Sequence, residues 1–249
     1  MSGHSKWASI KHQKAIKDSR RGQAFTKLTR AITVAAKAGG GDIDGNPSLA
    51  LAVQKAKDAS MPKDNIQRAI DKGTGAGADA ESFEEVMYEG YGPGGVALLI
   101  EALTDNRNRT GADVRNIFTK AGCALGEPGS VSYLFDKKGV VVVESEHASE
   151  DDLMVAIDAG AEDIVDNGDH FEVIAEPSDF QAVRKAIDEA GITIASSEVL
   201  WRPQVRTEVD EETAGKLFRL LEKLDENDDV GEVHGNYEVD DAVMEKLAG

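Results

Sequence analysis

A change of charge and composition near residue 75 constrains the fold of this chain more than any other feature. Residues 1–72 contain 14 lysines and arginines against 6 acidic residues, whereas the remaining 177 residues carry a net charge of −26. The boundary coincides with residues 73–78, Gly-Thr-Gly-Ala-Gly-Ala, whose composition is typical of a linker. The sequence therefore predicts a basic N-terminal domain, residues 1–77, joined to a larger acidic part.

The basic domain is predicted to contain three short helices. The first has an apolar stripe at helical spacing, formed by Phe25, Leu28, Ile32, Ala35 and Ala36. Its opposite face carries a polar, mainly positive ridge: Arg20, Gln23, Lys27, Arg30 and Lys37. Asn46 before Pro47 predicts the N-cap of a second helix, and a third helix is expected to end at Gly73. We expect the ridge to face outward, because the apolar stripe must pack inward.

Residues 137–202 have the β-α-β-β-α-β order of a ferredoxin-like domain. A strand at 140–143 is followed by Ser149 and Asp152, which can form a capping box at the start of a helix. Asn167-Gly168 predicts a hairpin between two strands. Ser178 is expected to cap a second helix, and residues 192–200 to form the last strand.

The segments on either side are expected to form one discontinuous α/β domain, residues 78–136 plus 203–249. Strands are predicted near 86–88, at 96–103, at 131–135 and around 230–239, with helices that contain Phe118 and Leu217. The predicted fold class is therefore α+β and multidomain: a three-helix domain precedes two α/β domains, and the ferredoxin-like one is inserted into the other.

Composition excludes several classes of protein. The longest apolar runs, such as residues 96–100, have five residues, far fewer than the roughly 20 that a membrane span requires. No apolar segment follows the first seven residues, so we expect no secretory signal. The single cysteine, Cys123, permits no internal disulfide, is interpreted as a packing residue and suits a reducing cytoplasm.

Motifs for enzymatic chemistry are weak or absent. Gly90, Gly92 and Gly95 match G-x-G-x-x-G, but an aliphatic strand follows them, which favours a glycine-rich loop between strands. Neither a P-loop nor G-x-S-x-G occurs. Residues 225–229 lack the glycine and glutamate of a calcium loop and predict a solvated turn, and the five histidines lack metal-ligand spacing. We expect no catalytic residue, no cofactor and no metal site.

Nucleic-acid binding explains the basic segment better than solubility does, because nine cations against one acidic residue fall within residues 1–37. Cations neutralise phosphates, and Trp7 and His12 offer planar groups for stacking on bases. The candidate contacts are Lys6, Trp7, Lys11, His12, Lys14, Lys17, Arg20, Arg21, Lys27 and Arg30. Charge alone does not choose between DNA and RNA.

Arg107 and Arg109 lie in the segment Thr-Asp-Asn-Arg-Asn-Arg-Thr, residues 104–110, within the acidic part. The favoured interpretation is a helix capped by Asp105, whose arginines pair with nearby carboxylates. The alternative is a secondary contact with an anionic ligand.

Several motifs resemble the YebC family over the whole chain. They are Gly3–Trp7, Phe25–Leu28, Met61–Ile66, Tyr88–Val96 and Leu103–Thr110. The resemblance implies a helical domain plus two α/β domains, and a cytoplasmic probable transcriptional regulator that binds DNA. The family also includes a mitochondrial translational activator of cytochrome c oxidase, and bacterial relatives linked to the ribosome and stalled translation. Relatives tend to carry arginines in the second helix, where this chain has Ser48 and Ala50, so contacts are expected at residues 4–37.

The leading hypothesis is a non-enzymatic, nucleic-acid-binding regulator of gene expression, whose acidic domains position the basic one or meet a protein partner. The alternative within this class is a ribosome-associated translation factor that binds RNA and relieves stalled translation. Two hypotheses from other classes are a metal-dependent hydrolase acting on nucleic acid, and an adaptor that binds only proteins. A membrane partner is not expected.

Overall fold

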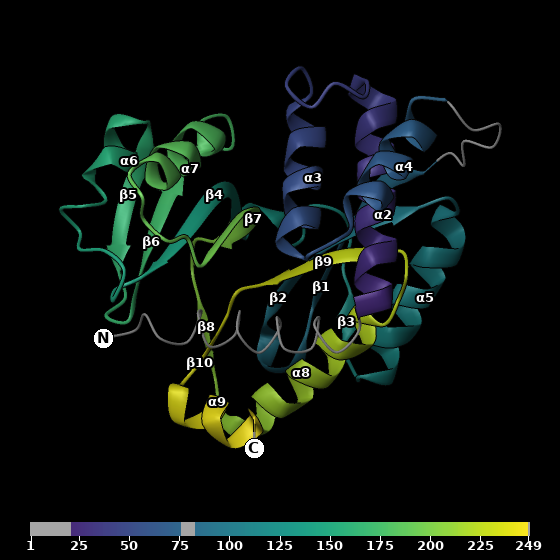
Figure 1. Cartoon of the computed structure of the whole chain (residues 1–249). Helices are drawn as coiled ribbons and strands as arrows, with labels where there is room; N and C mark the ends of the chain where they lie inside the picture. Colours follow the sequence, from purple (N-terminus) through teal and green to yellow (C-terminus); the bar gives the residue numbers. More distant parts are fainter. Residues whose placement is uncertain (1–20, 76–82, 249) are drawn as a thin grey trace.

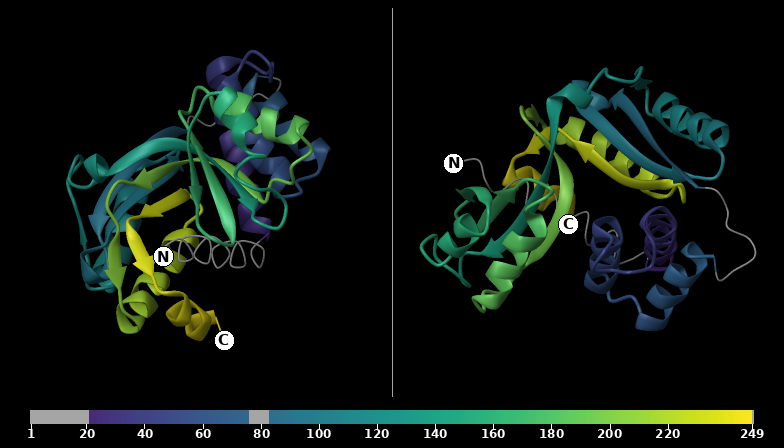
Figure 2. Two further views of the ribbon diagram at one scale, coloured as in Figure 1. Left: turned by 90° about the vertical axis from the view of Figure 1, so that its left-hand side faces the viewer. Right: turned by 90° about the horizontal axis from the view of Figure 1, so that it is seen from above.

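The computed structural model describes residues 21–75 and 83–248. A bundle of three helices, α2, α3 and α4, lies beside a body that contains two four-stranded sheets (Figure 1). Seen from above, the bundle is distinct from the sheet that contains β1 and β2 (Figure 2). The predicted α+β multidomain class, with a helical domain before the mixed α/β part, is confirmed.

The helical domain folds around its own core. Its helices are α2 (Arg21–Gly39), α3 (Pro47–Asp58) and α4 (Lys63–Gly73). The core cluster is formed by Ile32, Ala35, Ala36, Leu49, Ala52, Val53, Ala56, Met61, Ile66, Ala69 and Ile70. Ile32, Ala35 and Ala36 belong to the apolar stripe predicted for the first helix, and Phe25 and Leu28 of the same stripe pack against the cluster.

Asn46 fixes the junction between the first two helices. Its side chain accepts a hydrogen bond from Leu49 N at 3.1 Å and donates to the carbonyls of Ala35 and Gly40, both at 2.8 Å. The residue is 5% exposed, so these bonds satisfy groups that water does not reach. The predicted N-cap is confirmed, and Asn46 also ties α3 to the end of α2.

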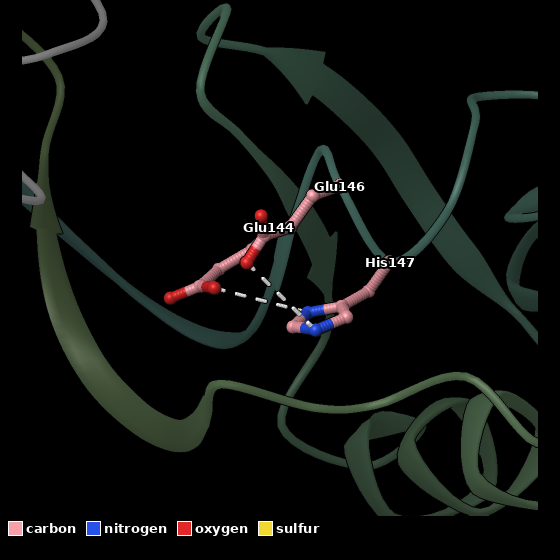
Figure 3. Close-up of side chains that lie close together, drawn as sticks. All are labelled: Glu144, Glu146 and His147. Atoms are coloured by element: carbon pink, nitrogen blue, oxygen red, sulfur yellow. Dashed lines mark ion pairs between the residues drawn. The ribbon is translucent and has the colours of Figure 1, made fainter.

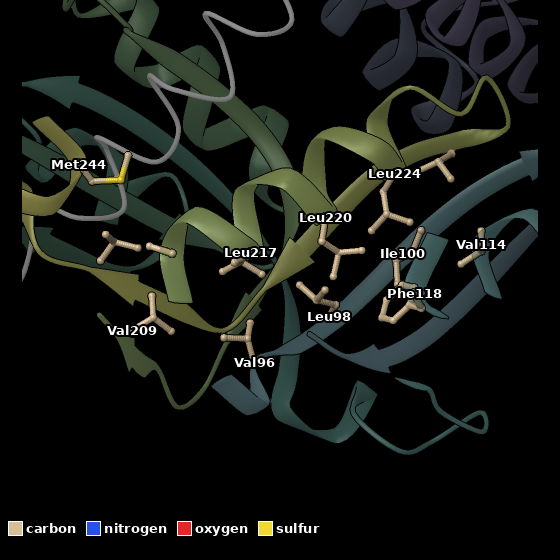
Figure 4. Close-up of a cluster of buried hydrophobic side chains, with 13 residues drawn as sticks. Val96, Leu98, Ile100, Val114, Phe118, Val209, Leu217, Leu220, Leu224 and Met244 are labelled. Atoms are coloured by element: carbon tan, nitrogen blue, oxygen red, sulfur yellow. The ribbon is translucent and has the colours of Figure 1, made fainter. Parts of the chain in front are cut away.

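The first sheet has the order β3-β1-β2-β9 and forms the centre of the body. Its strands are β1 (Glu84–Tyr91), β2 (Ala97–Thr104), β3 (Ala124–Leu125) and β9 (Val230–Gly235). Helices α5 (Arg107–Lys120) and α8 (Glu211–Asp225) cover one face. Leu217, Leu220 and Leu224 of α8 meet Leu98 and Ile100 of β2 in this core (Figure 4).

A buried carboxylate holds the loop that leads from the first sheet to the second. Glu89, on β1, accepts hydrogen bonds from the amides of Gly129, Val131 and Ser132 at 2.7 to 2.8 Å. Residues 132–134 consequently form a 3-10 turn, and the strand predicted at 131–135 is wrong. A side chain, not a neighbouring strand, takes the backbone donors there.

The second sheet has the order β5-β6-β4-β7, and every neighbouring pair is antiparallel. It consists of β4 (Phe135–Glu144), β5 (Ala161–Asp166), β6 (His170–Ala175) and β7 (Ser196–Pro203), with α6 (Met154–Asp158) and α7 (Phe180–Glu189) between strands. This is the ferredoxin-like arrangement that the sequence predicts, inserted between the strands and helices of the first sheet.

Local details of this insert differ from prediction in three places. The hairpin turn at Asn167-Gly168 is present. Ser149 and Asp152 exchange the hydrogen bonds of a capping box, with Asp152 Oδ2 accepting from Ser149 N at 2.9 Å, but they close a turn before α6, whose N-cap is Leu153. Ser178 does not cap α7, because its hydroxyl donates to the carboxylate of Asp179. The last strand begins at Ser196, later than predicted.

The strand expected around 230–239 is two strands that belong to different sheets. Buried Asn236 ends β9, because its Oδ1 accepts from Ala97 N at 2.8 Å and its backbone N–H donates to the Ala97 carbonyl at 3.1 Å. The chain then continues as β10 (Tyr237–Val239), which pairs in parallel with β8 (Thr207–Val209). Helix α9 (Asp241–Ala248) follows. Among the helices described, none has the length and apolarity to cross a membrane.

Candidate nucleic-acid interface

Two cations of the positive ridge of α2, Lys27 and Arg30, pair with the body and do not face solvent. Lys27 Nζ donates to the side chain of Asp225 at 2.9 Å and to its carbonyl at 2.6 Å. Arg30 Nη1 donates to the carbonyl of Asp228 at 2.7 Å and to Asp229 Oδ1 at 3.0 Å. The expectation of an outward ridge is therefore wrong at Lys27 and Arg30: the end of α8 and the following turn cover them (Figure 1).

A third ion pair joins the helical domain to β9, the strand that follows this turn. Lys55 Nζ of α3 lies 2.6 Å from Glu232 Oε1 of β9. Burial lowers the pKa of the Lys55 ammonium, but the carboxylates of Glu232, Glu198 and Glu101 outweigh burial and raise this pKa above its ordinary value. We call the three pairs Lys27–Asp225, Arg30–Asp229 and Lys55–Glu232 the interdomain seam.

Asp229 is the most highly connected group of the seam. Its side chain is 7% exposed, and its Oδ2 accepts from Arg109 Nη2 at 2.6 Å and from Thr110 Oγ1 at 2.7 Å. Burial alone would raise the pKa of Asp229, but these bonds and the charges of Arg109 and Arg30 keep it below the usual value. Asp229 therefore stays ionised and links α2 of the helical domain to α5 of the body.

The prediction of a solvated turn at residues 225–229 is wrong for this reason. Asp225 and Asp229 both bind cations of the helical domain, and the Asp228 carbonyl accepts from Arg30. Only long-range folding brings these groups together, since 198 or 199 residues separate the partners of each pair.

Arg109 follows the favoured interpretation, whereas Arg107 has no such carboxylate among the described residues. Arg109 pairs with Asp105 at 2.7 Å as well as with Asp229, and both raise its pKa. The guanidinium of Arg107 is exposed and has no ion-pair partner within residues 21–75 and 83–248. The cap of α5 is Asn106, whose Oδ1 accepts from Arg109 N at 3.1 Å, in place of the expected Asp105.

Two open hollows flank Arg30 at the seam. One, of about 290 Å³, lies against Phe25, Thr29 and Phe83, and the other, of about 360 Å³, lies against Phe83 and Asp113. The guanidinium of Arg30 stands over the ring of Phe83, 5.3 Å from its centroid.

The remaining candidate contacts lie outside the described residues or have an undescribed side chain. Lys6, Trp7, Lys11, His12, Lys14, Lys17 and Arg20 precede the first described residue, and only the backbone of Arg21 is described. Their role in binding stays a prediction.

Comparison with known proteins assigns the family. A sequence model for the TACO1/YebC protein N-terminal domain matches residues 5–76, and one for the TACO1/YebC second and third domain matches residues 83–237. The chain belongs to the YebC family. The resemblance identified from motifs is thereby confirmed.

Relatives of this YebC-family protein align along their full length. A protein of Rubrobacter xylanophilus is 55% identical over 250 residues, covering 100% of both chains, and one of Acidothermus cellulolyticus is 52% identical over 99% of this chain and 100% of its own. Both are named probable transcriptional regulatory protein. A crystal structure of a conserved hypothetical protein from Aquifex aeolicus has 43% identity and a TM-score of 0.78, covering 90% of this chain and 93% of its own.

Other cations of the YebC-family helical domain are exposed. Lys37 is the one described ridge lysine that faces solvent, and four more exposed cations lie on α3 and α4: Lys57, Lys63, Arg68 and Lys72. Opposite charges accompany some of them, as Asp58 and Asp64 are also exposed. Exposed cations of the helical domain therefore occur on α3 and α4 as well as on the ridge predicted from the sequence.

Two carboxylates and an imidazole meet at the turn after β4. Nδ1 of His147 lies 3.8 Å from Glu144 Oε2, and its Nε2 lies 3.9 Å from Glu146 Oε1 (Figure 3). Their potential ligand atoms lie within 4.8 Å of one another. The residues are neighbours in sequence on a largely exposed turn, where such groups commonly occur without a metal ion. They lie on the inserted domain, apart from the seam.

Cys123 and the glycine-rich segment follow their predictions. The thiol is half-buried against the core of the first sheet, and burial raises its pKa. Gly90, Gly92 and Gly95 lie at the end of β1 and in the short turn that leads into β2.

Proposed function

We propose that this YebC-family protein is a non-enzymatic regulator of gene expression that binds DNA through its basic N-terminal domain. One observation carries the proposal: nine cations against one acidic residue fall within the first 37 residues, at the start of a domain with its own core. The relatives named above are called regulators, which agrees with this role.

Phosphate neutralisation supplies the affinity in this proposal. Each phosphate that a cation neutralises releases counterions, and log affinity for duplex DNA falls against log salt with a slope of about −0.9 per phosphate. If about six phosphates are contacted, the slope is about −5. Such salt dependence is expected of binding by the N-terminal segment and not of an adaptor that binds only proteins.

The test removes cations near the N-terminus that are not among the three cations of the seam. Substitution of Lys6, Lys11 and Lys14 by alanine should lower the affinity for a DNA duplex and reduce the salt slope by up to about 3. The matched control removes three exposed lysines of the body by substituting alanine for Lys120, Lys185 and Lys216. Both variants lose the same formal charge.

Equal affinity of the two triple variants would overturn the proposal, because it would mean that net charge alone governs binding. A second experiment distinguishes DNA from RNA as the target: a promoter-DNA shift assay is compared with co-sedimentation with ribosomes in a sucrose gradient at the same salt. Ribosome association without a DNA shift would transfer the function to translation. Nuclease activity that depends on Mg²⁺ and disappears with a chelator would contradict a non-enzymatic role.

A further inference from the structure

The seam uses cations of the kind that a nucleic acid would need. Lys27 and Arg30 each bind a backbone carbonyl and a carboxylate of the body, and Lys55 binds Glu232. The side chains of Lys27, Arg30 and Lys55 are 14%, 25% and 25% exposed, and a phosphate that takes over their bonded protons has to displace these acceptors.

The acceptors of the seam come from one short segment of the body. Asp225, Asp228, Asp229 and Glu232 all lie between the end of α8 and the middle of β9. Their carboxylate and carbonyl oxygens accept hydrogen bonds from the cations, as the phosphate oxygens of a nucleic acid would. Oxygen atoms of both kinds are acceptors for charge-assisted hydrogen bonds, so they compete for the same lysine and arginine protons.

The helical domain does not depend on the seam for its core. Its core cluster consists of residues between Ile32 and Ile70, all from the helices and the turn before α4. Leu51 of α3 packs against the core of the second sheet, whereas Lys27, Arg30 and Lys55 reach residues 225–232 through hydrogen bonds and ion pairs. Separation at the seam therefore leaves the apolar core of the helical domain intact.

We propose that residues 225–232 act as an internal competitor of nucleic acid, which holds the helical domain closed by occupying Lys27, Arg30 and Lys55. This proposal rests on the proposed function, since it requires that the helical domain bind a polyanion. Nucleic acid displaces the acidic segment, takes over the three cations and releases Arg30 from the ring of Phe83. In the unbound protein the acidic segment thus occupies the cations that would bind nucleic acid. Binding of nucleic acid and opening of the seam are therefore coupled in one equilibrium.

The decisive variant neutralises two acceptors without removing a cation. Asp225→Asn combined with Glu232→Gln weakens two ion pairs and spares Asp229, which also holds Arg109 and Thr110. The matched control, Glu189→Gln with Glu212→Gln, loses two exposed carboxylates that pair only within their own helices. Each variant has two negative charges fewer than the parent, so the change in long-range electrostatic attraction to DNA is comparable in the two.

We expect the seam variant to bind a short DNA duplex about 3- to 10-fold more tightly than the control variant, because a part-buried ion pair holds each of two cations by a factor of a few. Equal affinity of the two variants, while the parent binds with a clear salt dependence, would overturn this inference and leave the proposed function standing. Absence of salt-dependent binding in all three proteins would overturn both.

A second measurement uses the unmodified protein and does not depend on the folding of a variant. The carboxyl carbons of Asp225 and Glu232 are followed by NMR with and without the DNA duplex. These carboxylates bind Lys27 and Lys55 across the seam, so displacement of the segment predicts that both carboxyl shifts change in the complex. Unchanged shifts at DNA concentrations that saturate binding would show that the seam stays closed and would refute the competitor role.

Discussion

Asp229→Asn tests the central group of the seam with almost no change of volume. The carboxylate accepts from Arg30 on Oδ1 and from Arg109 and Thr110 on Oδ2. An asparagine retains one acceptor and turns an NH₂ group toward the donors on the other side. At least one charge-assisted bond, worth about 1.5 to 3 kcal/mol, is lost, and the cations lose their buried counter-charge. We expect destabilisation of about 3 kcal/mol.

The control for this variant is Asp228→Asn, because it makes the same substitution one residue earlier at an exposed side chain. Asp228 meets Arg30 through its backbone carbonyl, which the substitution retains. Amide hydrogen exchange of Leu103 provides a local assay, since its N–H donates to the Asp229 carbonyl at 2.7 Å. Equal free energies of unfolding of the two variants in urea would refute the assignment of Asp229 as the link between α2 and α5.

The destabilisation caused by Asp229→Asn should depend on pH. The pKa of Asp229 is lowered in the folded protein, so this carboxyl binds protons more readily in the unfolded chain. Its stabilising contribution is therefore present above the unfolded aspartate pKa of about 3.9 and is lost as pH falls through the lower folded value. Urea unfolding should show a parent–variant difference at pH 7 that shrinks toward pH 3. A difference that grew on acidification would have the wrong sign.

Two further predictions concern residues that hold loops in place. Asn46→Ala removes a helix cap and leaves two carbonyls without their donor, so the helical domain should lose about 2 to 3 kcal/mol in urea unfolding, compared with little change for exposed Asp44→Ala. Glu89→Gln weakens three backbone hydrogen bonds to a carboxylate whose pKa they lower, so exchange of the Val131 amide should accelerate, whereas Glu85→Gln, exposed on the same strand, should leave it unchanged.

Much of the fold follows from local pattern. Asn46-Pro47 predicts the start of α3, the apolar stripe predicts the buried face of α2, and Asn167-Gly168 predicts the hairpin between β5 and β6. These features share one property: neighbours within a few residues determine them. The β-α-β-β-α-β order then leads to the second sheet, because the handedness and pairing rules for such units leave few topologies.

Prediction fails where a distant side chain decides the backbone conformation. The segment 131–135 is aliphatic and aromatic enough for a strand, but Glu89, more than 40 residues earlier, takes the amides of Val131 and Ser132. Asn236 likewise divides the strand expected around 230–239 by bonding to Ala97, 139 residues away. A single sequence contains no local signal for either contact.

At the candidate site, too, the sequence does not show which distant groups contact the charged side chains. Helical periodicity places Lys27 and Arg30 on one face of α2, and this placement is correct, but periodicity does not state what covers a face. The excess of positive charge predicts attraction to a polyanion, and the acidic body is itself a polyanion within reach. Charge segregation along the chain therefore favours an intramolecular contact between the basic and acidic parts as strongly as it favours binding of nucleic acid. Which contact prevails depends on how many phosphates the helical domain gains when it gives up Asp225, Asp229 and Glu232, and that exchange is what the seam variant measures.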